Sequence, residues 1–542
     1  MMVTIVGEPL SPSAPPEQPP VEPTFTRARP RPEPPPVHIN GISTHFKIGD
    51  SLEVATVLIR AMRAAGELVY TEKTFYHYAP AYGIFCALSD ADVARLIHRF
   101  TGATQGWRPS PEDEEKARIQ LERWQARCLA AEAEGEDHPP APKIRQPRLL
   151  PLNAPFVNAV MTSMIHELED PTFFEHAAPG IAFANGFVEV RPDAIYTLPH
   201  SPAHRARFAF QFDFTPTEKS ERFDTFCKQI WQDETPEEIA CRKQLYLAFI
   251  GTCNLGLATR FGKAIVQYGE GSNGKTTLME IVEGCMPGPD TITNVKPQAL
   301  GGEYYRDMLA GKLLNAVEEM PEAYIEDTGP LKAAITGDYM LGRAIRRAPR
   351  RFRPIAGHLY NANKLPQTAD HSAGFWRRLI LVDFKRDFAF GAGSAEAGTV
   401  KDMAKHVLEE VPTILCESLS AAWWALREDA YPEPHATTEL LAEWRAESDT
   451  IIEFIDTCLV TLEMNTPREH WMKSSDLYYV YNTWARQNGH KNPFASNAFR
   501  ARLKQLKYAR VRRADGHAYP FALKPALGMP TFNNGPTASV RH

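Results

Sequence analysis

The chain contains no apolar run that approaches the roughly 18 to 20 residues needed for a membrane-spanning helix. It also offers no signal-peptide core, because its first residues, MMVTIVGEPLSPSAPP, reach prolines before a long enough apolar segment has formed. These two absences predict a cytoplasmic protein without membrane partners.

Paired cysteines and an excess of positive charge are missing as well. The eight cysteines are scattered, with no CxxC pair and no histidine at zinc-finger spacing, so neither a disulfide framework nor a structural zinc site is predicted. The formal net charge is −6, which by itself gives no attraction to nucleic acid. An average hides local charge, however, and basic residues concentrate in two stretches described below.

Proline is plentiful at the amino-terminal end. Residues 1–40 hold twelve of the 45 prolines, a composition that favours extended backbone and cannot bury a core. We predict a disordered tail there, with a docking segment as the alternative, and a second disordered tail at residues 526–542.

The next part of the chain is predicted to hold two small domains. Residues 41–150 have the pattern of an α-rich module followed by a charged helix and a linker, and residues 151–250 that of an α+β domain. Asp90 and Asp92 resemble a metal-binding DxD motif. We interpret them as capping residues of a helix that begins after Ser89, because no histidine-bearing strand follows, as a primase centre would require.

The stretch AIVQYGEGSNGKTT has the pattern of a phosphate-binding loop. A short apolar strand ends at Tyr268, and the loop after it fits G-x-x-x-x-G-K-[ST] before a helical stretch. Its backbone N–H groups would cradle phosphates, Lys275 would neutralise the β and γ phosphates of ATP, and the Thr276 hydroxyl would bind Mg²⁺. The residues expected around the nucleotide are Gly269, Gly271, Ser272, Asn273, Gly274, Lys275, Thr276 and Thr277.

Three further polar groups are expected to complete the catalytic site. KLLNAVEEMPE predicts a second buried strand that ends in Glu318 and Glu319, of which one carboxylate can hold Mg²⁺ and the other can polarise the attacking water. GHLYNANKLP predicts a third strand ending at Asn363, which could orient that water. Arg377 and Arg378 precede a fourth strand, where an arginine can act as a finger for a neighbouring subunit's nucleotide.

The first basic stretch lies between these motifs, in LKAAITGDYMLGRAIRRAPRRFRP. A hairpin with so many arginines, inserted in an ATPase core, suits a loop that grips a phosphodiester backbone. The arginines expected to contact DNA are Arg343, Arg346, Arg347, Arg350 and Arg351.

The second basic stretch belongs to the region 440–525, where three predicted helices and a hairpin have the outline of a winged helix. The residues expected to contact duplex phosphates include Arg502, Lys504, Arg512 and Arg513. A structural cap that uses the same fold for subunit contacts is the alternative.

In this order, the motifs GEGSNGKTT, LLNAVEE, LKAAITGDYMLGRAIRR, YNANKLP and GFWRRLILVDF resemble those of superfamily III helicases. The resemblance is to the helicase part of the phage and plasmid primase-helicase family, which includes the poxvirus primase-helicase. It implies an AAA+-like α/β P-loop NTPase core over residues 251–430. By position, Thr276 and Glu318 are the expected Mg²⁺ ligands and Arg378 the expected finger.

The resemblance also implies an ATP-driven ring, usually a hexamer, that moves 3′ to 5′ on single-stranded DNA and acts on forked DNA during replication of a mobile element. The small module before residue 107 leaves no evident primase, so a separate primase or other replication proteins are expected as partners. Two alternatives stay open: an initiator or loader whose ATPase only switches assembly, and a P-loop enzyme of small-molecule phosphotransfer. Which glutamate is the base, and which of Arg377 and Arg378 is the finger, also stays open.

Overall fold

The computed structural model describes residues 5–6, 45–216, 219–346, 348–366, 368, 370, 372–386, 388, 403–488 and 493–524. Across these residues, no helix is both long and apolar enough to cross a membrane. The predicted tail at 526–542 lies outside the described residues, and so does nearly all of the predicted tail at 1–40. The exception is β1 (Ile5–Val6), which departs from the predicted disorder because its backbone pairs with the edge of a sheet.

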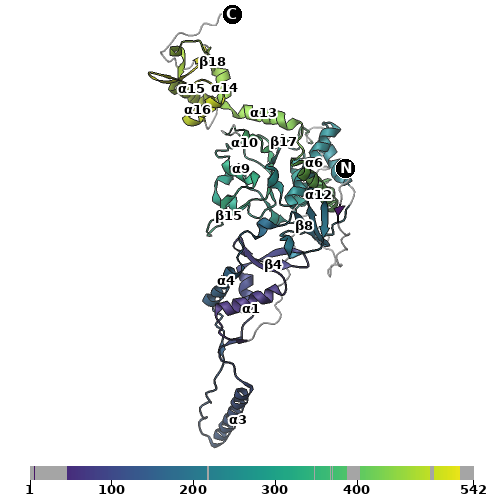
Figure 1. The fold of residues 1–542 in the computed structure, drawn as a ribbon, viewed down its shortest axis with the longest axis vertical. Helices are drawn as coiled ribbons and strands as arrows, with labels where there is room; N and C mark the ends of the chain where they lie inside the picture. Colours follow the sequence, from purple (N-terminus) through teal and green to yellow (C-terminus); the bar gives the residue numbers. More distant parts are fainter. Residues whose placement is uncertain are drawn as a thin grey trace.

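Three parts follow one another along the long axis of the molecule (Figure 1). An amino-terminal module with a projecting helix lies at one end, a sheet core lies in the middle, and a small carboxyl-terminal module lies at the other end. The site residues predicted from the sequence are divided between the middle part and the carboxyl-terminal module.

The amino-terminal module packs three helices and a β-sheet around one core. Its main elements are α1 (Ser51–Arg63), β3 (Leu68–Thr71), β4 (Thr74–Ala79), β5 (Ile84–Leu88), α2 (Asp90–His98) and α4 (Ala154–Leu168). Asp92 forms a capping box with Ser89, and Asp90 lies in the same first helical turn, as interpreted from the sequence. The hydrophobic cluster runs from Phe46 to Leu168, so this core continues past the predicted domain boundary at residue 150.

The predicted charged helix is α3 (Pro111–Glu134), which projects from this module (Figure 1). Its charges pair along the helix itself, since Arg118 lies 2.6 Å from Glu115 and 2.7 Å from Glu122. Pairing within the helix supports it where no other element covers it.

A four-stranded sheet joins the module to the core in the order β1-β10-β9-β8. Its other strands and the helix that follows are β8 (Gly180–Phe183), β9 (Gly186–Val190), β10 (Ile195–Leu198) and α5 (Glu221–Ile230). Phe183 packs against the rings of Phe210 and Phe214, which lie in the chain after β10.

Five parallel strands form the central sheet in the order β12-β13-β16-β11-β17. They are β11 (Ala264–Tyr268), β12 (Ile292–Thr293), β13 (Leu314–Val317), β16 (Gly357–Ala362) and β17 (Leu379–Asp383). β13, β16 and β17 are buried along their whole length, which explains the apolar residues of β13 and β17, whereas β16 also buries the polar side chains of His358 and Asn361. This parallel sheet with its helices confirms the predicted α/β core.

Two long helices, α6 (Pro236–Asn254) and α12 (Val411–Glu428), share one hydrophobic cluster with the sheet. The predicted boundary at residue 250 therefore falls inside a helix of the core. The helices approach each other closely at Gly251, where a Cβ atom would lie 2.1 Å from the backbone oxygen of Ser418.

α13 (Ala436–Ser448) connects the core to the carboxyl-terminal module (Figure 1). Trp444 of this helix packs against Phe375 and Trp376 of the core and donates a hydrogen bond to the carbonyl of Pro366. The module itself contains α14 (Thr450–Cys458), β18 (Leu459–Thr461), β19 (Met472–Lys473), α15 (Ser474–Gln487), α16 (Ser496–Gln505), β20 (Val511–Arg513), β21 (Gly516–Tyr519) and β22 (Phe521–Leu523). Its winged-helix assignment stays a prediction.

We expect Gly251→Ala to lower the free energy of unfolding by about 1–3 kcal/mol, because the added methyl group would meet backbone that cannot rotate away. Urea unfolding followed by tryptophan fluorescence measures this change. Gly301→Ala is the control, since a Cβ atom at Gly301 would have no neighbour within 4 Å. Equal urea midpoints for the two variants would show that α6 and α12 are not held at this distance.

Candidate functional site

The loop after β11 has the backbone of a phosphate-binding loop. Gly269 and Gly274 have φ angles of +151° and +93°, and a Cβ atom at Gly269 would lie 2.4 Å from the backbone oxygen of Phe384. Glycine is therefore required at both positions, which the motif fixes. Gly271 and Ser272 are exposed at the tip of the loop, and Asn273 is buried beneath it.

The loop is tied to the segment that follows β17. The Asn273 side chain donates a hydrogen bond to the Phe384 carbonyl at 2.9 Å, and the Phe388 N–H donates to the Ser272 carbonyl at 2.9 Å. These bonds join residues more than a hundred positions apart and hold the loop open toward solvent.

Lys275 begins α7 (Lys275–Gly284) and is buried. Its Nζ donates to the carbonyls of Gly269 and Glu270 at 2.6 and 2.7 Å and to Asn273 Oδ1 at 3.0 Å. Burial lowers the pKa of Lys275 to about 8. Among the described residues no carboxylate pairs with this lysine, so its charge is available to an anion. Thr276 and Thr277 follow in the first turn, and Thr276 is exposed.

The parallel sheet brings the other predicted groups to the same edge as this loop. Glu318 and Glu319 directly follow β13 and are exposed, and Asn363 directly follows β16 and is exposed as well. Because β16 lies between β11 and β13, the asparagine is placed between the loop and the two glutamates. The glutamates also line a cavity of about 850 Å³.

The geometry adds a residue that the sequence analysis missed at this edge. Asn361, the penultimate residue of β16, is buried, and both polar atoms of its side chain lack a hydrogen-bond partner. Its carbonyl accepts a 2.7 Å hydrogen bond from the N–H of Met320, which fixes the segment after the glutamates against β16.

The two predicted finger arginines lie at the opposite edge of the sheet. The Arg378 carbonyl accepts a hydrogen bond from Ala264, the first residue of β11, whereas the phosphate-binding loop starts after the last residue of that strand. A strand of this length spans about 15 Å, so Arg378 is too far from the loop of its own chain to contact a phosphate there. Arg377 is exposed, and Arg378 is half-buried and bonded to the carbonyl of Gly374.

A buried arginine on α6 supports the loop from behind. Arg242 donates to Glu238 at 2.8 Å, to the Asp383 carbonyl at 2.8 Å and to the Asp383 carboxylate at 2.7 Å. Burial alone lowers the pKa of Arg242, but the bond to Glu238 and the charges of Asp383 and Glu234 raise it above its usual value. Asp383 ends β17 and directly precedes Phe384, which holds the loop. The helical spacing of Glu238 and Arg242 is readable in the sequence, but the link to Asp383 is not.

The first basic stretch forms the predicted hairpin, called here the basic hairpin, which consists of β14 (Met340–Gly342), β15 (Arg350–Phe352) and the residues between them. Arg343, Arg346 and Arg351 are exposed, and Arg347 lies outside the described residues. Arg350 differs from the prediction, because its guanidinium pairs with Asp307 at 2.7 Å and fastens the base of the hairpin.

Asp307 belongs to α8 (Glu303–Asp307), a short helix beside the basic hairpin that the sequence analysis did not single out. Tyr304 and Tyr305 of this helix are 52% and 53% exposed, and Ile345 near the tip of the hairpin is 79% exposed. Exposed aromatic rings beside arginines are the combination that binds unpaired nucleic-acid bases and phosphates. The pair Tyr304–Tyr305 in GGEYYRD could have been noticed in the sequence.

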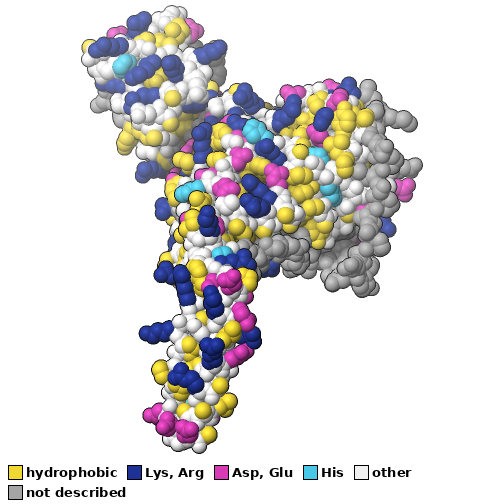
Figure 2. Space-filling model, turned by 60° about the horizontal axis from the view of Figure 1, so that its bottom comes forward, with side chains coloured by type: hydrophobic (Ala, Val, Ile, Leu, Met, Phe, Trp, Pro, Cys, Tyr) yellow, Lys and Arg dark blue, Asp and Glu magenta, His cyan; other side chains and the backbone are white. Residues whose placement is uncertain are grey.

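The predicted basic residues of the carboxyl-terminal module divide into two groups. Lys504 and Arg512 are exposed, on a module whose visible face carries many basic side chains (Figure 2). Arg502 is buried and paired with Asp449, and the Arg513 guanidinium bonds three backbone carbonyls between residues 468 and 471. These contacts tie both arginines to their own module, and their role in DNA contact stays a prediction.

Two family models match parts of the chain. Residues 267–378 match a family of unknown function (DUF5906), and residues 446–513 match a family described as Poxvirus D5 protein-like. A protein of Acanthamoeba polyphaga mimivirus, named as a putative helicase, is 25% identical over 280 residues, which cover 48% of this chain and 28% of that protein. The chain thus spans little more than a quarter of this relative's length. The poxvirus-like match and the mimivirus relative confirm the predicted resemblance to primase-helicase-like superfamily III helicases.

Solved structures of the NrS-1 carboxyl-terminal region without ligand are also similar. One has a TM-score of 0.40 at 12% identity and covers 88% of this chain and 99% of its own. A second has a TM-score of 0.36 at 10% identity, with the same coverage of both chains.

We expect Arg242→Met to destabilise the core by about 3–5 kcal/mol, because Glu238 would stay buried without its cation and Asp383 would keep only the exposed Lys385. Chemical unfolding of the two proteins measures the loss. Lys385→Ala is the matched control: it removes a cation 3.1 Å from the same aspartate, but from the exposed side, and should cost about 1 kcal/mol or less. A similar loss for both variants would contradict the role given to the buried arginine.

Proposed function

We propose that this chain is an ATP-driven DNA helicase or translocase that works as a ring, in the replication of a phage, plasmid or other mobile element. One observation carries the proposal: Lys275 and Arg378 lie at opposite edges of the same sheet. A site that uses both residues then needs two copies of the chain, with the lysine of one protomer and the arginine of the next on the same triphosphate.

The residues around the phosphate-binding loop have the chemistry for ATP and Mg²⁺. The N–H groups of residues 269–277 and the Lys275 ammonium would hold the phosphates, and Thr276 and Glu318 would hold the ion. Bound Mg²⁺ would neutralise charge that develops on the phosphates. Glu319 would accept a proton from the attacking water, and Asn363 would orient that water.

The nucleic-acid side of the proposal rests on the basic hairpin and α8. Arg343, Arg346 and Arg351 offer cations for a sugar-phosphate backbone, and Tyr304 and Tyr305 offer rings for bases. This combination favours single-stranded DNA as the track. The exposed Lys504 and Arg512 would contact the duplex ahead of a fork through a winged helix.

The ring size of six, the 3′ to 5′ direction and a separate primase partner are parts of this proposal that come from the family resemblance. The description of the mimivirus relative as a helicase supports the same class of activity. Strand displacement on a forked substrate separates this proposal from the alternative of an initiator or loader, which would bind the fork and leave it annealed.

Lys275→Ala should reduce the ATPase rate at least about a hundredfold, because the cation that contacts the phosphates in the transition state would be lost. A coupled ATPase assay with and without single-stranded DNA measures this change, and DNA should stimulate only the unchanged protein. Lys263→Ala is the control, since Lys263 lies just before the other end of β11 and pairs with Glu433. An unaltered ATPase rate for Lys275→Ala would refute the assignment of the site.

Mixing two inactive variants tests the shared site directly. Lys275→Ala and Arg378→Ala protomers should each lack ATPase activity alone. In an equal mixture about a quarter of the interfaces combine an intact lysine with an intact arginine, if the protomers assort at random. Activity should therefore return to about that fraction of the original rate.

Arg377→Ala in place of Arg378→Ala serves as the comparison, because Arg377 is exposed and adjacent. If Arg377→Ala is inactive and Arg378→Ala is active, the finger is Arg377 and not Arg378. Full activity of a strictly monomeric Arg378→Ala protein would end the proposal of a shared site.

A further inference from the structure

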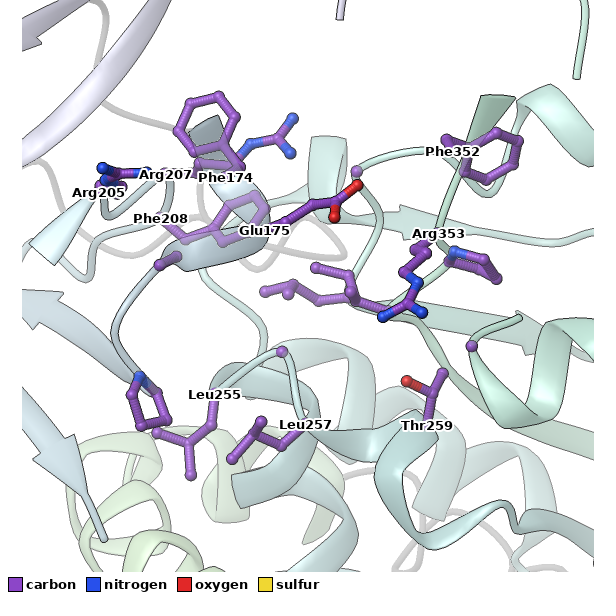
Figure 3. A pocket seen from close by; sticks show the side chains of 18 of the residues that line it. Phe174, Glu175, Arg205, Arg207, Phe208, Leu255, Leu257, Thr259, Phe352 and Arg353 are labelled. Carbon is purple, nitrogen blue, oxygen red and sulfur yellow. The ribbon is translucent and has the colours of Figure 1, made fainter. Parts of the chain in front are cut away.

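A cavity of about 470 Å³ lies between the central sheet and the segments that precede it (Figure 3). One wall comes from the segments 171–180 and 205–208. The other comes from the end of α6 and from residues 351–355, which lead from the basic hairpin into β16. Since these residues precede β16, the cavity is at the opposite edge of the sheet from the phosphate-binding loop and is a separate site.

Positive charge dominates the cavity, which is lined by five arginines and two glutamates. Two of the arginines are neutralised, because Arg207 pairs with Glu72 at 3.0 Å and Arg260 pairs with Asp429 at 3.3 Å. The other three arginines have no carboxylate partner among the described residues. They are Arg205, Arg351 and Arg353.

These three guanidinium groups are held in place by neutral contacts. Arg205 donates to the Phe173 carbonyl at 2.8 Å, and Arg351 and Arg353 lie 3.8 and 4.5 Å from the centre of the Tyr339 ring. Aromatic contacts of this kind orient an arginine without neutralising it. The cavity therefore presents three oriented guanidinium groups against the carboxylate of Glu175, a net positive charge that favours an anion.

Aromatic side chains form part of the same wall. Phe174 and Phe208 line the cavity, and in Figure 3 Arg353 and Glu175 project into it from opposite sides. The hydroxyl of Tyr339 donates to both oxygens of Glu175 at 3.1 Å, so a direct bond from the hairpin side to the upstream wall closes this end of the cavity. A ring surface next to arginines fits a ligand with a flat base and a phosphate.

We propose that this cavity binds a nucleotide, with its phosphate on Arg353 and its base against the phenylalanine wall. The return strand of the basic hairpin leads into the cavity through Arg351 and Phe352, so a strand that follows the hairpin would place one of its nucleotides there. Only this source of the nucleotide rests on the proposed function. A free nucleotide has the same chemistry, and the experiment separates the two.

Two substitutions with opposite expected effects test the site. Arg353→Ala removes a phosphate contact and should weaken binding about tenfold. Glu175→Gln removes a negative charge from the cavity while an amide oxygen can still accept from Tyr339, so it should strengthen binding about two- to fivefold. A purely structural role for both residues would weaken binding in both variants.

Binding is measured on the full chain carrying Lys275→Ala, so that the phosphate-binding loop contributes little. The probes are a fluorescein-labelled oligothymidylate of about 12 nucleotides, followed by anisotropy, and free thymidine monophosphate, followed by calorimetry. Arg118→Ala is the control, since Arg118 lies on α3 and contacts only residues of that helix among those described.

Opposite shifts of oligothymidylate affinity in the two variants support a strand nucleotide in the cavity, and opposite shifts of thymidine monophosphate affinity support a free one. No shift with either probe, or weakening in both variants, would overturn the proposal. ATPase rates of Arg353→Ala and Glu175→Gln in the otherwise unchanged chain report separately on the motor, so a failed cavity and a failed motor are distinguishable.

Discussion

The buried contact between Arg242 and Asp383 is the constraint on which the candidate nucleotide site depends. It fixes the end of β17 to α6, and the next residue, Phe384, then accepts the hydrogen bond that holds the phosphate-binding loop. A loop of this kind has little structure of its own, because the backbone angles at Gly269 and Gly274 favour glycine, which is flexible in isolation. The buried pair of Arg242 and Asp383 therefore helps to fix the shape of the phosphate-binding loop.

The two edges of the central sheet carry different groups of predicted site residues. Parallel strands align their carboxyl ends, so the lysine, the two glutamates and Asn363 meet at one edge, although they are spread over some ninety residues of sequence. The other edge carries the arginine pair and the cavity behind the basic hairpin. The proposed nucleotide chemistry and the proposed nucleic-acid contact would thus lie at opposite edges of the same sheet.

Elements of secondary structure that follow a local sequence pattern could be predicted from the sequence. Buried parallel strands are rich in apolar residues, and β11, β13 and β17 lie where short apolar runs occur; β16 lies where it was predicted although it also contains His358 and Asn361. The fate of individual arginines was not predictable, because the partners of Arg350 and Arg502 lie 43 and 53 residues away and no local pattern announces them. The cavity could not be predicted from the sequence either, because its walls come from segments that are distant in the sequence and lie together only in the fold. The domain boundaries predicted at residues 150 and 250 do not coincide with the cores. The amino-terminal core extends past residue 150 into α4, and α6 of the central core spans residue 250.

Trp444 joins the connecting helix α13 to the core. Its indole rests on Phe375 and Trp376, the two residues directly before the arginine pair. The helix that leads to the carboxyl-terminal module is thus in contact with the segment that carries the exposed Arg377 and the half-buried Arg378. Because the three rings meet edge to face, a displacement of α13 relative to the core would be passed directly to the residues before Arg377 and Arg378.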